Sequence, residues 1–217
     1  MTRSTPAGWD LERDAIAHGA TCVAGIDEAG RGAWAGPVAA ACVVLPLGVD
    51  LPGLTDSKQL TPSRRAELEL RIEDCAVAIG FALASQAEID RLNILRATHL
   101  AMRRSFEIVR SLAPEAFGLI DGLPVPGFPA PCRSVVRGDC LSASIAAASV
   151  IAKVRRDRIM VDLQGRYGRF AFARHKGYGT QLHRSELQQF GPCPEHRLSY
   201  RPVVEASMAV MGRLHGG

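Results

Sequence analysis

Two apolar segments separated by a glycine-rich turn constrain the fold most, because they predict a strand pair near the start of the chain. Residues 21–26 and 38–45 are the predicted strands, and the turn between them contains Gly30, Arg31 and Gly32. The two strands are expected to pair as a hairpin. Helices and strands alternate in the rest of the chain, so a mixed sheet covered by helices, an α/β fold, is predicted.

Caps, turns and apolar periodicity predict the remaining elements. Helices are expected at residues 9–18, after the cap Thr61 with Pro62 in the first position, from the capping box at Ser85 onward to about 112, and at 141–166, 180–190 and 203–214. Strands are expected at 77–84, 116–120 and 132–136. Residues 122–131 hold four prolines and two glycines and are predicted to form a loop. No linker indicates a second domain.

Composition narrows the class of protein. With 217 residues, 47% of them hydrophobic, the chain can bury a sizeable core. No apolar run reaches the roughly 18 residues that a membrane span needs, and the polar N-terminus does not resemble a signal peptide, so a cytoplasmic location is expected. The six cysteines form no Cys-x-x-Cys pair, so they are interpreted as reduced thiols rather than zinc ligands or disulfides.

Positive charge is concentrated in one part of the sequence. The formal net charge is +4, yet residues 133–201 carry 13 Lys and Arg against five Asp and Glu. Such an asymmetry is typical of a surface that binds nucleic acid, and a solvated basic helix would give the same pattern. Charge alone leaves both interpretations open.

Adjacent carboxylates stand where the first predicted strand ends. Asp27 and Glu28 are hard oxygen ligands of the kind that Mg²⁺ and Mn²⁺ require. Gly30 and Gly32 leave the backbone of the following turn accessible to a ligand, while Arg31 supplies positive charge. The pattern therefore predicts a metal ion beside a phosphate, and the alternative is a surface turn with a salt bridge.

Two further aspartates occupy comparable positions. Asp121 ends the predicted strand 116–120, and Asp139 lies between a strand and the start of a helix. Ligands bind at such strand ends in open α/β sheets. Four carboxylates are thus expected to converge at one edge, although each aspartate taken singly is more typical of a cap or turn.

Several separated motifs, taken together and in order, resemble the ribonuclease HII family. They are the stretch 25–32, Asp56-Ser57-Lys58, the helix segment 144–154 and the segment 175–179, with the two aspartates described above. The resemblance covers about residues 23–202. It implies a ribonuclease H-like core at about 20–166, a C-terminal helical part at about 167–217 that contributes to substrate binding, and one catalytic domain of 217 residues. It also implies endonucleolytic cleavage of RNA in RNA/DNA hybrids, including single ribonucleotides embedded in duplex DNA.

The resemblance also assigns the chemistry. Asp27, Glu28, Asp121 and Asp139 match the family's catalytic metal ligands, which hold two divalent ions, Mn²⁺ or Mg²⁺. The products implied are a 3′-hydroxyl and a 5′-phosphate, so the 2′-hydroxyl is not the nucleophile and remains available for recognition.

Substrate contacts are implied at eight positions. The backbone of Gly30, Arg31 and Gly32 is expected to read the 2′-hydroxyl, and the ring of Tyr178 to pack on the next sugar. Lys58 matches a phosphate-contacting lysine, and Ser57, Lys153 and Lys176 are further candidates for contact with the nucleic-acid backbone. Alternatives remain: Tyr178 as a core tyrosine, and an ion pair between Lys153 and Asp157. Ala33-Trp34 departs from the family, which usually has proline after the glycine turn.

Other classes of function fit parts of the pattern. A ribonuclease HIII-like enzyme would prefer long hybrids, but that family carries an extra N-terminal substrate-binding domain, and about 20 residues precede the first strand here. A hybrid-binding module without catalysis would not need all four carboxylates. A small-molecule phosphatase is a more distant alternative. The expected protein is a monomer that binds RNA/DNA hybrid or ribonucleotide-containing DNA and no membrane.

Overall fold

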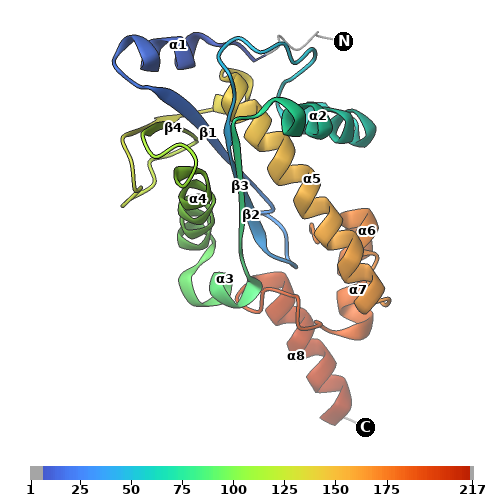
Figure 1. Ribbon diagram of the computed structural model, residues 1–217. Helices are drawn as coiled ribbons and strands as arrows, with labels where there is room; N and C mark the ends of the chain where they lie inside the picture. Colours follow the sequence, from blue (N-terminus) through green and yellow to red (C-terminus); the bar gives the residue numbers. More distant parts are fainter. Residues whose placement is uncertain (1–6, 216–217) are drawn as a thin grey trace. The chain divides into compact units, whose positions relative to one another are not determined.

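The computed structural model describes residues 7–215, which form a five-stranded sheet and eight α-helices (Figure 1). These residues divide into two compact units. The sheet unit comprises the chain up to Ala29, Ala39–Leu83 and Thr98–Val154, and the helical unit comprises Gly30–Val38, Ala84–Ala97 and the chain from Arg155 onward. Among the described residues, no helix is both long and apolar enough to cross a membrane.

The sheet is mixed, with strand order β3-β2-β1-β4-β5. Its strands are β1 (Cys22–Ala29), β2 (Val38–Val44), β3 (Ala78–Ala84), β4 (Ala116–Asp121) and β5 (Cys132–Val135). β1 pairs with β2 in antiparallel orientation and with β4 in parallel orientation, and β4 is parallel to β5. The predicted hairpin and the predicted mixed sheet are both confirmed.

Local sequence signals correctly predicted most of the helices. The helices are α1 (Asp10–Ala17), α2 (Pro62–Cys75), α3 (Gln86–Leu92), α4 (Ile94–Arg110), α5 (Ala143–Arg166), α6 (Phe172–His175), α7 (Gln181–Phe190) and α8 (Arg201–His215). Thr61 caps α2 by accepting a hydrogen bond from the N–H of Arg64, and Ser85 forms the predicted capping box with Glu88. These caps satisfy N–H groups that a helix leaves unpaired at its start.

Three elements differ from the prediction. The helical stretch expected from Ser85 to about 112 is broken at Asn93, whose φ of 69° is incompatible with a right-handed helix and whose side chain caps α4 through the N–H of Arg96. β1 runs three residues beyond Ile26, because its pairing with β2 continues through Ala29. The short helix α6 was not predicted, since four residues give too little periodicity to detect.

In the sheet unit, α2 and the first half of α5 cover one face and α4 covers the other (Figure 1). Leu68 and Ile72, one turn apart on α2, are fully buried in the cluster that α2 and α5 form with β2. Gly25 allows a close approach between strand and helix, because a Cβ there would lie 2.1 Å from the carbonyl carbon of Ser144. Only glycine fits this contact between β1 and α5.

The helical unit has its own apolar core. It is formed by residues of the second half of α5, α7, α8 and the segments beside them, namely Ala35, Met160, Leu163, Phe170, Phe172, Leu187, Val203 and Ala206. Ala35 brings the segment after the glycine turn into this core. The turn is therefore anchored by burial of its downstream residues.

Candidate active site

Three carboxylates converge in the sheet unit, at the ends of two neighbouring parallel strands. Asp27 and Glu28 lie close to the end of β1, and Asp121 is the last residue of β4. One oxygen from each of the three lies within 4.8 Å of the others. Asp27 is only 3% exposed. The parallel pairing of β1 with β4 brings these side chains together.

Asp139 lies beside this cluster, in the short 3₁₀ turn Gly138–Cys140 that precedes α5. The N–H of Gly138 donates a hydrogen bond of 2.7 Å to the carboxylate of Asp121, which ties this turn to the end of β4. Asp139 itself accepts a 3.2 Å hydrogen bond from Nζ of Lys58. The structure thus brings the fourth predicted carboxylate to the same edge, paired with a lysine.

Lys58 is held by a local turn and by charge. The side chain of Asp56 accepts the N–H of Lys58, and its carboxylate lies 3.7 Å from the Lys58 ammonium. Burial opposes the charged form of Lys58, but Asp56, Asp27 and Asp139 outweigh this effect and raise the pKa of its ammonium. The side chain remains three-quarters exposed (75%), so a stable positive charge faces solvent next to the acidic cluster.

The acidic cluster carries more negative charge than its surroundings neutralise. Burial, followed by repulsion from Glu28 and Asp121, raises the pKa of Asp27 well above the ordinary aspartate value. Burial and then repulsion from Asp139 raise the pKa of Asp121 in the same direction. Crowded, desolvated carboxylates of this kind are stabilised by a divalent cation.

Replacing Asp27 with asparagine is expected to stabilise the metal-free protein at neutral pH. The folded-state pKa of Asp27 is raised, so its stabilising contribution is present below the ordinary aspartate pKa and is lost as the pH rises through the folded-state value. Asparagine carries no charge, so it would avoid the free-energy cost of burying an ionised carboxylate beside Glu28 and Asp121. Its side-chain oxygen could still accept a hydrogen bond from the N–H of Glu28. We expect a melting temperature about 2–4 °C higher, the shift that 1 kcal/mol produces in domains of this length.

The measurement is thermal unfolding with a chelator at neutral and acidic pH. The difference from wild type should vanish at acidic pH, where Asp27 is protonated. Asp50→Asn, at an exposed position of the same unit, is the matched control and should leave the melting temperature unchanged. An unchanged or lower melting temperature for Asp27→Asn at neutral pH would show that the buried charge of Asp27 does not destabilise the metal-free protein.

The glycine turn and Tyr178 lie together in the helical unit. Gly30 has a φ of +93°, which favours glycine, and Arg31 and Gly32 are exposed. Ala33 forms an isolated β-bridge with Tyr178, and the N–H of Trp34 donates a 2.7 Å hydrogen bond to the carbonyl of Gly177. The two predicted recognition segments are therefore neighbours, although they are far apart in sequence.

The remaining predicted contacts fall in different surroundings. Ser57 is buried, and its hydroxyl accepts a 2.7 Å hydrogen bond from Ser149. Lys153 is half-buried on α5. Lys176 adopts a left-handed conformation at the end of α6, where its ammonium donates a hydrogen bond to the carbonyl of Ala173. The side chains of Ser57 and Lys176 thus both form hydrogen bonds within the fold.

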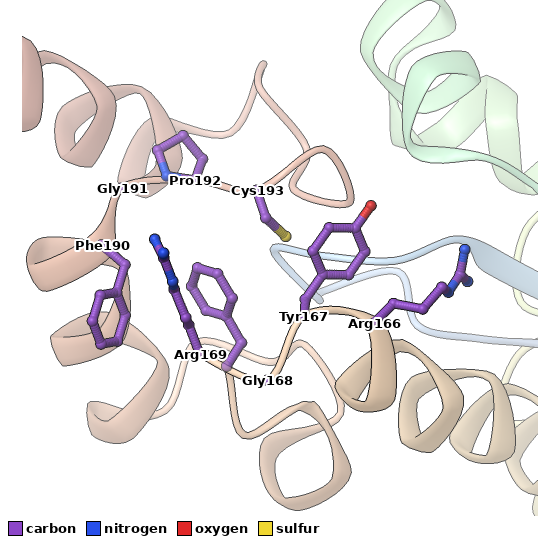
Figure 2. A pocket seen from close by; sticks show the side chains of 9 residues that line it. Arg166, Tyr167, Gly168, Arg169, Phe190, Gly191, Pro192 and Cys193 are labelled. Carbon is purple, nitrogen blue, oxygen red and sulfur yellow. The ribbon is translucent and has the colours of Figure 1, made fainter.

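A cavity of about 340 Å³ lies elsewhere in the helical unit (Figure 2). The last residues of α5 and α7 and the residues that follow them line it: Arg166, Tyr167, Gly168, Arg169, Phe170, Phe190, Gly191, Pro192 and Cys193. It contains none of the predicted catalytic, metal or substrate residues. The acidic cluster therefore remains the candidate active site.

Sequence reasoning missed two arginines of the helical unit. Arg156 and Arg197 are fully buried, and their guanidinium groups donate to main-chain carbonyls. Both stand in the basic part of the sequence, where arginine ordinarily indicates an exposed side chain. No local signal distinguishes them, because the carbonyls that they bind come from distant segments.

Solved structures with a similar fold define the class of protein. A ribonuclease H2 from Pyrococcus horikoshii OT3 matches with a TM-score of 0.69 and 25% identity over 87% of this chain and 98% of that chain. The structure of Bst-RNase HIII in complex with Mn²⁺ shares the fold, with a TM-score of 0.65 and 18% identity over 90% of this chain and 71% of that chain. The fold is thus ribonuclease H-like.

Sequence comparison identifies the family within this class. The ribonuclease HII family model matches residues 24–203. Ribonuclease HII of Geobacter sulfurreducens is 49% identical over 201 residues, which cover 92% of this chain and 91% of the relative. The chain belongs to the ribonuclease HII family. It is accordingly a ribonuclease H endonuclease that acts on the RNA of RNA/DNA hybrids.

Proposed function

We propose that the protein cleaves on the 5′ side of single ribonucleotides embedded in duplex DNA, as well as within longer RNA/DNA hybrids, and leaves a 3′-hydroxyl and a 5′-phosphate. The observation that carries this proposal is the convergence of Asp27, Glu28 and Asp121, with ligand oxygens within 4.8 Å of one another. A cluster this crowded fits metal-dependent phosphodiester chemistry.

The donor set fits divalent ions. The carboxylates of Asp27, Glu28 and Asp121 would hold them, with Asp139 as the fourth ligand beside Lys58. The chemistry that two such ions supply when bound is activation of a water molecule and stabilisation of charge on the leaving 3′ oxygen. Mg²⁺ and Mn²⁺ both accept this ligand set.

The protein's own side chains would position the substrate. The exposed ammonium of Lys58 is placed to attract a backbone phosphate, and its raised pKa keeps it charged. Ser57, Lys153 and Lys176 are the other candidates for backbone contact. Ser57 would act through its position in the turn, since its side-chain oxygen already accepts from Ser149.

Recognition of the ribose is assigned to the helical unit. The backbone of Gly30, Arg31 and Gly32, in which Arg31 and Gly32 are exposed, offers N–H groups that can donate to a 2′-hydroxyl oxygen, and the neighbouring ring of Tyr178 offers an apolar surface for the next sugar. A deoxyribose suits that surface because it lacks the hydroxyl. The basic residues between 155 and 201, including those of the C-terminal helical part, would add electrostatic attraction to the duplex.

A direct assay tests the proposal. The protein is incubated with three labelled duplexes, one containing a single ribonucleotide, one an all-RNA strand on DNA, and one all DNA, with Mg²⁺, with Mn²⁺ and with a chelator. We expect cleavage of the first two duplexes only in the presence of metal, with the single ribonucleotide retained at the 5′ end of the downstream product. Mass analysis of the products identifies the 3′-hydroxyl and 5′-phosphate ends.

The same assay separates the alternatives. Cleavage of the all-RNA strand without cleavage at the single ribonucleotide would support a ribonuclease HIII-like specificity and overturn this proposal. Binding of all hybrids without cleavage would support a binding module. Hydrolysis of a mononucleotide ester with no need for a duplex would support a phosphatase. Asp27→Asn is the control that shows whether any cleavage comes from the acidic cluster.

A further inference from the structure

Two arginines in the helical unit are fully enclosed, although arginine is among the residues least often buried. Burial lowers the pKa of Arg156 to about 10 and also lowers the pKa of Arg197. Enclosing a guanidinium is costly unless its donors are hydrogen-bonded. The placement of these donors therefore indicates what each arginine does.

Arg197 holds the carbonyl groups of the glycine turn. Its Nη2 donates to the carbonyl of Gly30 at 2.7 Å, and its Nη1 donates to the carbonyl of Arg31 at 2.8 Å. The hydroxyl of Tyr200 donates a third hydrogen bond, of 3.0 Å, to the carbonyl of Arg31. Charge-assisted hydrogen bonds from one rigid guanidinium thus fix two successive peptide groups.

The fixed carbonyls determine where the N–H groups of the turn point. In a trans peptide the C=O and the N–H of one group point in opposite directions, and the described chain has no cis peptide. The carbonyls of Gly30 and Arg31 face the buried Arg197, so the N–H groups of Arg31 and Gly32 face away from it. Arg31 and Gly32 are exposed, so these two donors are directed to the surface.

Arg156 connects the turn segment with the Tyr178 segment. Its guanidinium donates to the carbonyls of Ala35 and Pro37 on one side and of Lys176 on the other, at 2.9–3.2 Å. It also lies 5.5 Å from the centre of the Tyr178 ring. Gly30 packs directly on this side chain, because a Cβ there would lie 1.9 Å from Nε of Arg156.

We propose that Arg197, supported by Arg156, is a positioning residue for ribonucleotide recognition, which orients the N–H groups of Arg31 and Gly32 without touching the substrate. This inference rests on the proposed function of the glycine turn. In this inference the buried guanidinium of Arg197 holds the glycine turn ready to bind a 2′-hydroxyl, and discrimination between ribose and deoxyribose depends on this pre-organisation.

The test measures binding rather than cleavage, in the Asp121→Asn background. Dissociation constants are determined for a DNA duplex with one ribonucleotide and for the same duplex without it. Arg197→Lys keeps the positive charge but loses the forked donors, and we expect the preference for the ribonucleotide to fall about tenfold. Tyr200→Phe removes one hydrogen bond to Arg31 and retains the ring beside Arg197, and a fall of about threefold is expected.

Leu187→Ala, a cavity in the core of the same unit, is the matched control. It should lower the melting temperature and leave the ratio of the two dissociation constants unchanged. An unchanged ratio in folded Arg197→Lys, or in Tyr200→Phe if the former does not fold, would overturn the inference while leaving the proposed function in place. If the Asp121→Asn parent showed no preference for the ribonucleotide, recognition by the turn would itself be wrong.

Discussion

Asp27→Asn and Asp121→Asn are each expected to reduce cleavage of a ribonucleotide-containing duplex by about 1000-fold or more, which corresponds to ~4 kcal/mol of transition-state stabilisation. Each substitution keeps the size of the side chain but removes a negative charge from the cluster of three carboxylates. The charge that would hold the divalent ions is then insufficient. Single-turnover rates at saturating metal provide the measurement.

Binding of the duplex should survive both substitutions. The basic residues of the helical unit are untouched, and loss of a negative charge beside the nucleic acid favours association. Asp50→Asn serves as the control for a neutralised aspartate that lies outside the cluster. Cleavage within about tenfold of wild type for either variant would show that the carboxylate in question is not a metal ligand.

Tyr178→Ala is expected to lose more activity on a single ribonucleotide in DNA than on an all-RNA strand paired with DNA. The ring's proposed partner is the deoxyribose that follows the ribonucleotide, and the all-RNA strand does not present it. The expected difference between the two losses is about 1–3 kcal/mol, the range measured for stacking contacts with nucleic acids. The measurement is the ratio of kcat/KM values for the two substrates.

Two controls distinguish loss of the proposed sugar contact from a structural change in the active site. Tyr178→Phe keeps the ring and should retain most of the selectivity, and the metal affinity of Tyr178→Ala should equal that of wild type. Equal losses on both substrates would identify Tyr178 as a structural residue, held by its β-bridge to Ala33 and its contact with Arg156.

The parts of the fold that were predictable depend on neighbours in sequence. The caps at Thr61 and Ser85 involve residues three positions apart, and both helices begin where these caps predict. The break at Asn93 was not predicted. Asparagine adopts either a negative or a positive φ, and its sequence neighbours do not show which one it takes. Similarly, β1 is longer than its apolar residues suggest, since its pairing with β2 extends the strand through two charged residues.

In the candidate site as well, some residues were predictable from the sequence and others depend on contacts with distant segments. Asp27, Glu28 and Asp121 were predictable because strand ends in a parallel arrangement bring carboxylates to one edge. Their assignment as metal ligands remains a prediction, as do the substrate contacts. Most hydrogen bonds of the Arg156 and Arg197 guanidinium groups go to carbonyls more than 100 residues away, so nothing in their own sequence neighbourhood indicates burial. Long-range hydrogen bonds to backbone carbonyls leave no local pattern.

The glycine contact between β1 and α5 has a consequence for how firmly the acidic edge is held. At Gly25 the main chain of the strand meets the main chain of the helix directly, two residues before Asp27. Side chains can change rotamer, but two backbones in contact can separate only when the strand and the helix part. This contact thus fixes the main chain of β1 close to Asp27 and Glu28, and we expect the acidic edge to be among the last parts of the sheet unit to open during thermal fluctuation.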